Sequence, residues 1–323
     1  MKCLKSSSGS IINSPSEQDT ANGLWMTLCS YVLWGAFPVY FYWLRHVSAT
    51  EILAHRILWS LVLLLLFGVI TGVHPWRGVI ASRRNVAVCL VSALLLSVNW
   101  LIYIWAIGNG RALEGSLGYF INPLVSVLLA VVVLNEALSK LQLVAILMAT
   151  VAVLYLTFMV GEIPWVAISL AFAFGAYGLI HKKYQINAIG GLTVETMLMA
   201  PFAAAYLVML IGTSQNGFLA GDLTTDLLLL AAGPITSIPL LLYLKGLSRL
   251  RLSTVALLQY TVPSLQFLVA VYILNEPLSR EKLLSFVLIW LGLLIFSVDI
   301  LQQRSRNNRL RREQATVGPT QQR

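Results

Sequence analysis

Three titratable side chains interrupt an apolar stretch near residue 50, in the segment TEILAHRILWS. Glu51 and His55 are four residues apart, so on a helix they share one face. Arg56 follows directly. A charged side chain inside a bilayer costs several kcal/mol unless it faces a cavity or a partner, which makes each of these residues a functional candidate. For Arg56 the alternative is an interfacial side chain that reaches back to water.

A second buried carboxylate occurs far along the chain. Glu195 is the only acidic residue well inside the apolar stretch 191–212, and it lies 140 residues after His55. Histidine titrates near neutrality, and a buried carboxylate can also hold a proton. We therefore predict that His55, Glu195 and Glu51 are candidates for proton coupling. A static, hydrogen-bonded pair is the alternative.

Polar side chains also gather before two prolines inside apolar stretches. In EGSLGYFINP (114–123), Tyr119 and Asn122 lie about one turn apart, next to Pro123. Polar groups beside a broken helix suit a substrate site at the middle of a membrane. The alternative is packing, with interhelical hydrogen bonds for the polar residues and interfacial belts for Trp and Tyr. The predicted substrate-binding residues are Tyr119, Asn122, Tyr260, Gln259, Asn99, Trp100, Tyr103 and Trp34. The predicted helix-breaking or gating prolines are Pro123 and Pro263.

Patterns that indicate an enzyme are missing from the sequence. Its four histidines belong to no HExxH motif, and no GxSxG motif, Walker loop or pair of intramembrane aspartates occurs. The three cysteines show neither a disulfide framework nor metal-ligand spacing. We predict no catalytic residue, no metal, no cofactor and no ATP-driven activity.

These residues are positioned by membrane-spanning helices. The chain is 58% hydrophobic and only 11% charged, far from the composition of a soluble domain. A helix needs about 20 mostly apolar residues to cross a bilayer. The predicted spans are 22–44, 51–73, 86–107, 113–134, 141–160, 164–181, 191–212, 227–246, 252–274 and 283–303.

The spans repeat. Residues 123–140 align with 263–280 without a gap, with nine identities in eighteen positions that include both prolines and the phrase LNE. The same offset of 140 residues places the segment Gly35-Ala36-Phe37 on Gly175-Ala176-Tyr177. The predicted organisation is a disordered tail at 1–21, a five-helix repeat at 22–160, a second at 161–303 and a basic tail at 304–323.

Five helices per repeat is an odd number, so the second repeat enters the membrane from the opposite side. The predicted fold class is an all-α polytopic membrane protein built from two inverted five-helix repeats, an architecture common among carriers. We interpret the repeated phrase as a turn. Asn135 tolerates a left-handed helix end, Ser139 with Gln142 fits a capping box, and Glu136 can pair with Lys140.

Several polar segments resemble a known family. TEILAHRILWS (50–60), NWLIYIWAI (99–107), LEGSLGYFINPLVS (113–126) and RLSTVALLQYTVPSLQFLVAV (251–271) are similar to the RarD family, the chloramphenicol-sensitive proteins, in the EamA branch of the drug/metabolite transporter superfamily. The likeness covers about residues 22–303. It implies a ten-helix, inverted-repeat carrier of the inner membrane for amino acids, metabolites or drugs.

We therefore predict a secondary transporter of small metabolites, amino-acid-like compounds or drugs that works by alternating access, exports its substrate and is coupled to protons. The alternatives are a channel or uncoupled facilitator, and an intramembrane enzyme. The expected partners are a small-molecule substrate and the lipid bilayer, with anionic lipid at the basic tail RSRNNRLRR and no nucleic acid. The oligomeric state stays open, and the expected location is the inner or plasma membrane.

Orientation follows from the basic residues. Sixteen of the 22 Lys and Arg residues fall on the side of the two termini, four fall on the other side, and two lie within span ends. Cytoplasmic loops hold the excess of positive charge, so we expect both termini to be cytoplasmic.

This orientation is testable with single cysteines in a cysteine-free background. A cysteine at Asn216 is expected to react with a membrane-impermeant maleimide added to intact cells, and a cysteine at Asn187 only after the cells are permeabilised. The reverse pattern of labelling contradicts the orientation.

Overall fold

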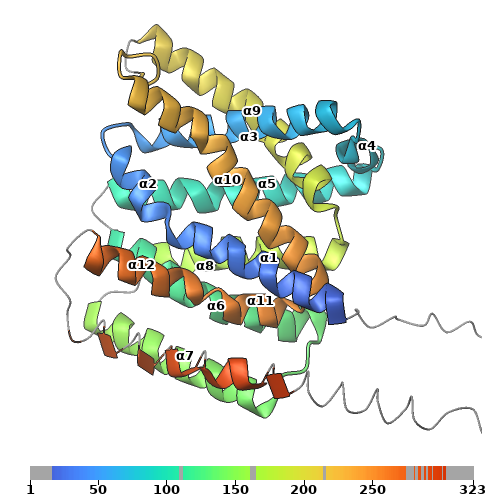
Figure 1. Ribbon diagram of the computed structural model, residues 1–323, viewed down its shortest axis with the longest axis vertical. Coiled ribbons are helices and arrows are strands. Elements are labelled where there is room, and N and C mark those ends of the chain that lie inside the picture. The colour runs from blue at the N-terminus through green and yellow to red at the C-terminus, as the bar shows by residue number, and fades with distance from the viewer. Residues whose placement is uncertain are drawn as a thin grey trace, which may run out of the picture.

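The computed structural model describes residues 17–108, 112–160, 165–213 and 216–273, together with residues 280, 283–284, 287–288, 290–292, 294–299 and 301–302. Regular structure in these residues is entirely helical (Figure 1). The helices are α1 (Glu17–Gly35), α2 (Phe37–Trp43), α3 (Ala49–Thr71), α4 (Pro75–Ile80), α5 (Arg83–Gly108), α6 (Ala112–Leu134), α7 (Lys140–Val160), α8 (Trp165–Tyr184), α9 (Ala188–Gly212), α10 (Leu223–Arg249), α11 (Leu252–Leu258) and α12 (Thr261–Tyr272).

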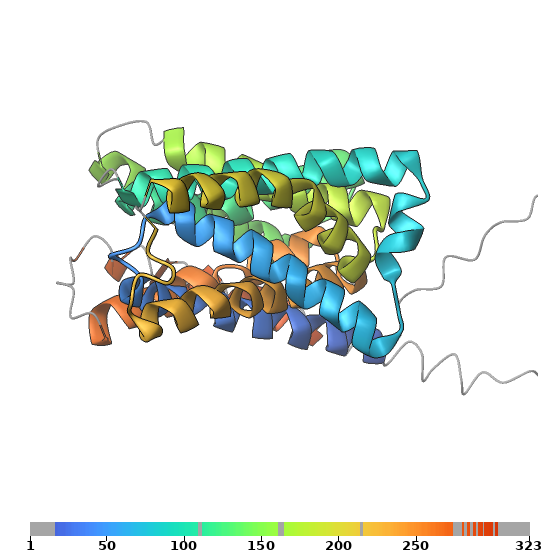
Figure 2. The ribbon, with the colours of Figure 1, turned by 90° about the horizontal axis from the view of Figure 1, so that it is seen from above.

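Seven of the described helical segments are long and apolar enough to cross a membrane, so the chain is a multi-pass membrane protein. Seen from above, the helices form a bundle whose long axes follow one general direction (Figure 2). α9 and α10 run obliquely across the other helices, while α7 lies at the opposite edge of the bundle from α9 (Figure 1).

Two predicted spans are broken. The span expected at 22–44 divides into α1 and α2 at Ala36, because Pro38 stands in the first turn of α2, where a missing N–H group costs no hydrogen bond. The span expected at 252–274 divides into α11 and α12 at Gln259 and Tyr260, just before Pro263. The short helix α4 was not predicted. The described residues of the span 283–303 are helical, and residues 285–286, 289, 293, 300 and 303 lie outside the described part of the chain.

The turn after α6 confirms two details of the sequence analysis. Asn135 has φ 54°, the left-handed conformation expected at a helix end. The capping box is formed, since Ser139 Oγ accepts from the N–H of Gln142 at 3.1 Å and Gln142 Oε1 accepts from the N–H of Ser139 at 3.1 Å. The equivalent turn of the second repeat, residues 274–279, lies outside the described residues.

The expected pairing of Glu136 with Lys140 is wrong. In place of Lys140, its carboxylate accepts hydrogen bonds from the backbone N–H of Leu252 at 2.8 Å and of Ser253 at 3.1 Å, and it lies 3.5 Å from Arg251 Nε. The free N–H groups at the start of a helix attract a carboxylate. Glu136 therefore caps α11 and joins the two halves of the chain.

Contacts between the two halves occur in pairs that are equivalent under the 140-residue offset. α1 packs on α10 of the second half, and α8, the first helix of the second half, packs on α5. A Cβ atom at Gly35 would lie 2.6 Å from Leu265 Cβ, and one at Gly175 would lie 3.2 Å from Val125 Cγ1. Gly35 and Gly175 are 140 residues apart, and so are Val125 and Leu265, so the two contacts are equivalent under the offset of the sequence repeat.

Gly233 lies where α10 packs tightly against the backbone of α3. A Cβ atom there would lie 2.4 Å from the backbone carbonyl carbon of Trp59, which cannot move aside without shifting α3. We expect Gly233→Ala to lower the unfolding temperature, because overpacking of this kind costs ~1–3 kcal/mol against a gain in helix propensity of ~0.5–1 kcal/mol.

The matched control is Gly78→Ala in α4, where an added Cβ atom meets nothing within 4 Å. It should leave the unfolding temperature unchanged or raise it slightly. Thermal unfolding of the purified protein in detergent compares the two variants, and equal shifts would show that the contact between α3 and α10 is not tight.

Candidate functional site

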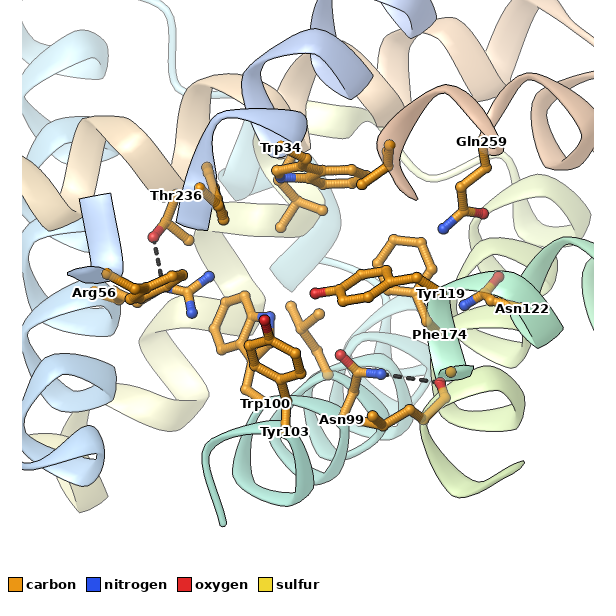
Figure 3. Close-up of a pocket in the computed structure, with 17 residues that line it drawn as sticks. Trp34, Arg56, Asn99, Trp100, Tyr103, Tyr119, Asn122, Phe174, Thr236 and Gln259 are labelled. Carbon is orange, nitrogen blue, oxygen red and sulfur yellow. Dashed lines mark hydrogen bonds between the residues drawn. The ribbon is translucent and has the colours of Figure 1, made fainter. Parts of the chain in front are cut away.

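A cavity lies between the two halves of the chain, and residues of both halves line it (Figure 3). Its walls come from α1, α2, α3, α5 and α6 of the first half and from α8, α10, α12 and the turn between α11 and α12 of the second. The lining residues are Trp34, Phe37, Phe41, Arg56, Leu96, Asn99, Trp100, Tyr103, Gly118, Tyr119, Asn122, Leu170, Phe174, Thr236, Leu240, Gln259 and Val262.

Seven of the 17 lining residues are aromatic, and several of their rings pack on one another. Trp34 packs edge-on against Phe174, with ring centroids 5.6 Å apart, and Tyr103 packs edge-on against Tyr119 at 5.6 Å. Edge-to-face pairs of this kind stabilise defined ring orientations. The cavity therefore presents apolar surfaces whose orientation is set by packing.

Three amide side chains supply part of the polar wall. Asn99 Nδ2 donates to the carbonyl oxygen of Leu170 at 2.9 Å, which ties α5 to α8. Asn122 Oδ1 accepts from Ser126 Oγ at 3.0 Å, one turn farther along α6. Gln259 stands in the break between α11 and α12, so the broken helix contributes directly to the cavity (Figure 3).

Seven of the eight residues predicted to bind substrate line this cavity. They are Trp34, Asn99, Trp100, Tyr103, Tyr119, Asn122 and Gln259. The eighth, Tyr260, does not: it is 1% exposed and packs in a separate core with Phe120, Leu257 and Phe296. Gln259 and Tyr260 both stand in the break between α11 and α12, but only Gln259 lines the cavity.

Arg56 also lines the cavity, although it was not among the residues predicted to bind substrate or to couple protons. The residue is only 7% exposed, so it is not an interfacial side chain. Its Nε donates to Thr236 Oγ1 at 2.8 Å, and its guanidinium carbon lies 4.6 Å from the ring centroid of Trp100. The signal in the sequence was the charge within an apolar stretch, but the sequence alone did not show which way the side chain points.

The remaining titratable residues of α3 lie outside the cavity lining. Glu51 Oε1 accepts hydrogen bonds from the N–H groups of Gly217 at 2.7 Å and Phe218 at 3.1 Å. His55 Nδ1 accepts from Trp59 Nε1 at 3.0 Å, and its buried Nε2 has no hydrogen-bond partner among the described residues. Glu51 thus anchors the segment before α10 to the start of α3.

Glu195 lies in a different environment from His55. It is fully buried, and its carboxylate lies 2.7 Å from His181 Nε2 and accepts a hydrogen bond from the Tyr177 hydroxyl at 3.2 Å. His181 was not predicted as a partner. His181 lies near the end of α8 and Glu195 in the first half of α9, on either side of a short connection, so this pair could have been found by asking which residues face each other across that connection.

The two predicted gating prolines are buried next to the cavity. The prediction that Pro123 breaks its helix is wrong, because α6 continues from Ala112 to Leu134 with Pro123 inside it, directly after Asn122. Pro263 follows both the break between α11 and α12 and the lining residue Val262. Within the described part of the chain, no group of three or more His, Cys, Asp or Glu side chains is arranged to hold a metal ion.

Comparison with known proteins agrees with this architecture. The sequence matches the EamA-like transporter family twice, over residues 21–158 and 163–298. It is 43% identical to an "Uncharacterized transporter" of Vibrio cholerae over 89% of this chain and 96% of that protein. It is 37% identical to "Protein RarD" of Escherichia coli over 90% of this chain and 99% of that protein.

A solved crystal structure with 17% sequence identity superposes with a TM-score of 0.66 and covers 87% of this chain and 96% of the other, which shows a shared fold. The two family matches divide the chain into the same halves as the internal repeat. Helical multi-pass transporters of bacteria reside in the inner membrane. On these grounds the chain belongs to the EamA-like transporter family, within its RarD group.

Proposed function

We propose that the protein is a secondary carrier that exports small metabolites, amino-acid-like compounds or drugs by alternating access, using ten spans arranged as two inverted five-helix repeats. The observation that carries this proposal is the cavity, because helices from both halves line it with aromatic, amide and guanidinium groups. Rearrangement of one half against the other can expose such a site to alternate sides of the membrane.

Two carboxylates of the first half hold the second half at opposite ends of the bundle. Glu51 accepts from the backbone of the loop before α10, and Glu136 accepts from the backbone at the start of α11. Figure 1 shows the loop between α9 and α10 at one end and the turn between α6 and α7 at the other. We propose that these two links break in alternation as the carrier changes conformation.

Pro123 and Pro263 suit the bending that such a change requires. Pro123 removes a hydrogen-bond donor inside α6, and Pro263 stands in the first turn of α12, next to the break between α11 and α12. The proposal therefore assigns to them the role of hinges for opposite gates, with the cavity between them.

Proton coupling is assigned to the buried pair of Glu195 and His181. A carboxylate and an imidazole 2.7 Å apart can share or exchange a proton, and Tyr177 extends the hydrogen-bonded group toward Phe174 of the cavity wall. His55, at the equivalent position of the first repeat, is the second coupling candidate, because its buried Nε2 can take up a proton. The alternative remains a permanent structural pair.

A channel and an intramembrane enzyme are the competing functions. Among the described residues of the cavity wall there are no acidic side chains, no cysteines and no histidines, so they provide neither a ring of acidic charge nor a nucleophile with its base. The relatives are named transporters, which also favours transport.

Counterflow separates a carrier from a channel and identifies the substrate in the same experiment. Proteoliposomes are filled with an unlabelled bacterial metabolite extract or with buffer, and a uniformly ¹³C-labelled extract is added outside. We expect one class of labelled metabolite to enter the preloaded vesicles faster than the empty ones, because a carrier returns to the outer side more rapidly when loaded.

Protein-free vesicles are the control, and mass spectrometry of the vesicle contents is the measurement. Equal entry into both preparations would indicate a channel. Absence of any protein-dependent entry would remove the support for transport.

Glu195→Gln tests the proton site, using the metabolite that counterflow identifies. Glutamine is neutral at every pH, so we expect gradient-driven accumulation to fall to the level measured without a pH gradient, while exchange of substrate persists because it requires no net movement of protons. Asp222→Asn is the matched control: this exposed carboxylate caps α10, and asparagine caps helices equally well.

The measurement is uptake into proteoliposomes with and without an imposed pH gradient. If the wild-type protein does not respond to the gradient, proton coupling is wrong. If Glu195→Gln responds to the gradient as the wild-type protein does, Glu195 has a structural role.

A further inference from the structure

We propose that Arg56 is the anion-binding subsite of the cavity and that the transported ligand is a monocarboxylate with a flat, apolar body. This inference names the substrate class and rests on the proposed function only where it concerns transport. The carboxylate would accept hydrogen bonds from the terminal nitrogens of the Arg56 guanidinium, and the apolar body would lie against the aromatic wall.

The charge of Arg56 has no acidic partner among the described residues. Its one hydrogen bond in that part of the structure goes from Nε to the neutral Thr236, and its other neighbours are the rings of Trp100 at 4.6 Å, Phe41 at 5.7 Å and Phe37 at 6.0 Å. A buried charge without a counterion is costly. A ligand that brings the counterion removes much of this cost.

Nearby carboxylates are already engaged elsewhere. Glu51, one turn before His55 on α3, accepts two backbone hydrogen bonds from residues 217 and 218. Asp226 Oδ1, on the neighbouring α10, accepts from the N–H of Leu219 at 2.6 Å. Both carboxylates therefore hold the loop before α10, and neither lines the cavity.

The guanidinium is held in a fixed orientation. Thr236 binds its Nε, and the face of Trp100 supports its plane. Figure 3 shows the terminal nitrogens directed into the cavity, on the side where the hydroxyl of Tyr119 points back toward them. Two parallel donors on a planar fork match the two oxygens of a carboxylate.

The rest of the wall defines the body of the ligand. Trp34, Phe37, Phe41 and Phe174 present apolar rings, so a flat apolar group fits between them. One buried cation balances one negative charge, which favours a carboxylate over a dianionic phosphate monoester. An aromatic cage for a cationic ligand is disfavoured, because Arg56 already occupies the face of Trp100 and would repel a second cation.

Four benzene derivatives of similar shape test the charge preference: benzoate, benzamide, benzylammonium and phenyl phosphate. Their dissociation constants are measured with the purified full-length protein in detergent by isothermal titration calorimetry. We expect benzoate to bind about ten-fold or more tightly than benzamide, as the gain of charge-assisted hydrogen bonds implies, and to bind more tightly than the other two probes.

Variants test whether Arg56 causes the preference for benzoate over benzamide. Arg56→Gln should bring benzoate and benzamide within about two-fold of each other, and Arg56→Lys should retain only part of the preference, because an ammonium group lacks the planar fork. Arg45→Gln is the matched control: Arg45 also lies over an aromatic ring, that of Tyr42 at 4.6 Å, but it is exposed and outside the cavity lining.

The inference is overturned if benzoate does not bind, if benzamide, benzylammonium or phenyl phosphate binds as tightly as benzoate, or if the preference for benzoate survives in Arg56→Gln. Should that variant fail to fold, the ranking of the four probes on the wild-type protein still decides. Binding is measured without transport, so loss of counterflow with the benzoate preference intact would refute only the carrier function, and the reverse result would refute only the subsite.

Discussion

The interior of a bilayer contains no water, so a polar group in the bundle depends on a partner inside the protein. This constraint accounts for the arrangement of the buried charged residues. Glu195 lies against His181 and Tyr177, and Arg56 bonds to Thr236 while its plane rests on Trp100. In each case the partner comes from another helix, so satisfying a polar group also fixes how two helices pack.

The same requirement joins the two halves. Glu51 and Glu136 accept backbone N–H groups that no helix can satisfy, at the loop before α10 and at the start of α11. A carboxylate bound to backbone donors makes a strong but small contact, whereas packed helix faces are extensive. Links of this type can open without unfolding the helices that carry them, which is what a carrier needs at the two ends of a central cavity.

The polar groups of the cavity wall differ in whether they have a partner in the protein. The amide of Asn99 is used to tie α5 to α8, and the aromatic rings hold one another by edge-on contacts. The terminal nitrogens of Arg56 remain directed into the open space (Figure 3). A site with apolar walls and one oriented cation can select a ligand by charge and by shape at the same time.

The sequence by itself determined the membrane class, the internal repeat and the approximate ends of most helices, because these depend on local composition and on chemistry along the chain. Asn135 and the capping box of Ser139 and Gln142 are examples in which local preference was enough. It also indicated most of the cavity residues, since polar side chains are rare inside apolar segments.

Tertiary structure decided which polar groups meet. Glu136 pairs with α11 rather than with its neighbour Lys140, Glu195 pairs with His181, and Tyr260 turns into a core while Gln259 faces the cavity. Arg56 could have reached an interface or a cavity, and only the packing of α3 against α10 directs it inward. Side-chain direction around a helix, and the helix that lies opposite, are set by contacts between segments far apart in the chain, which no local pattern encodes.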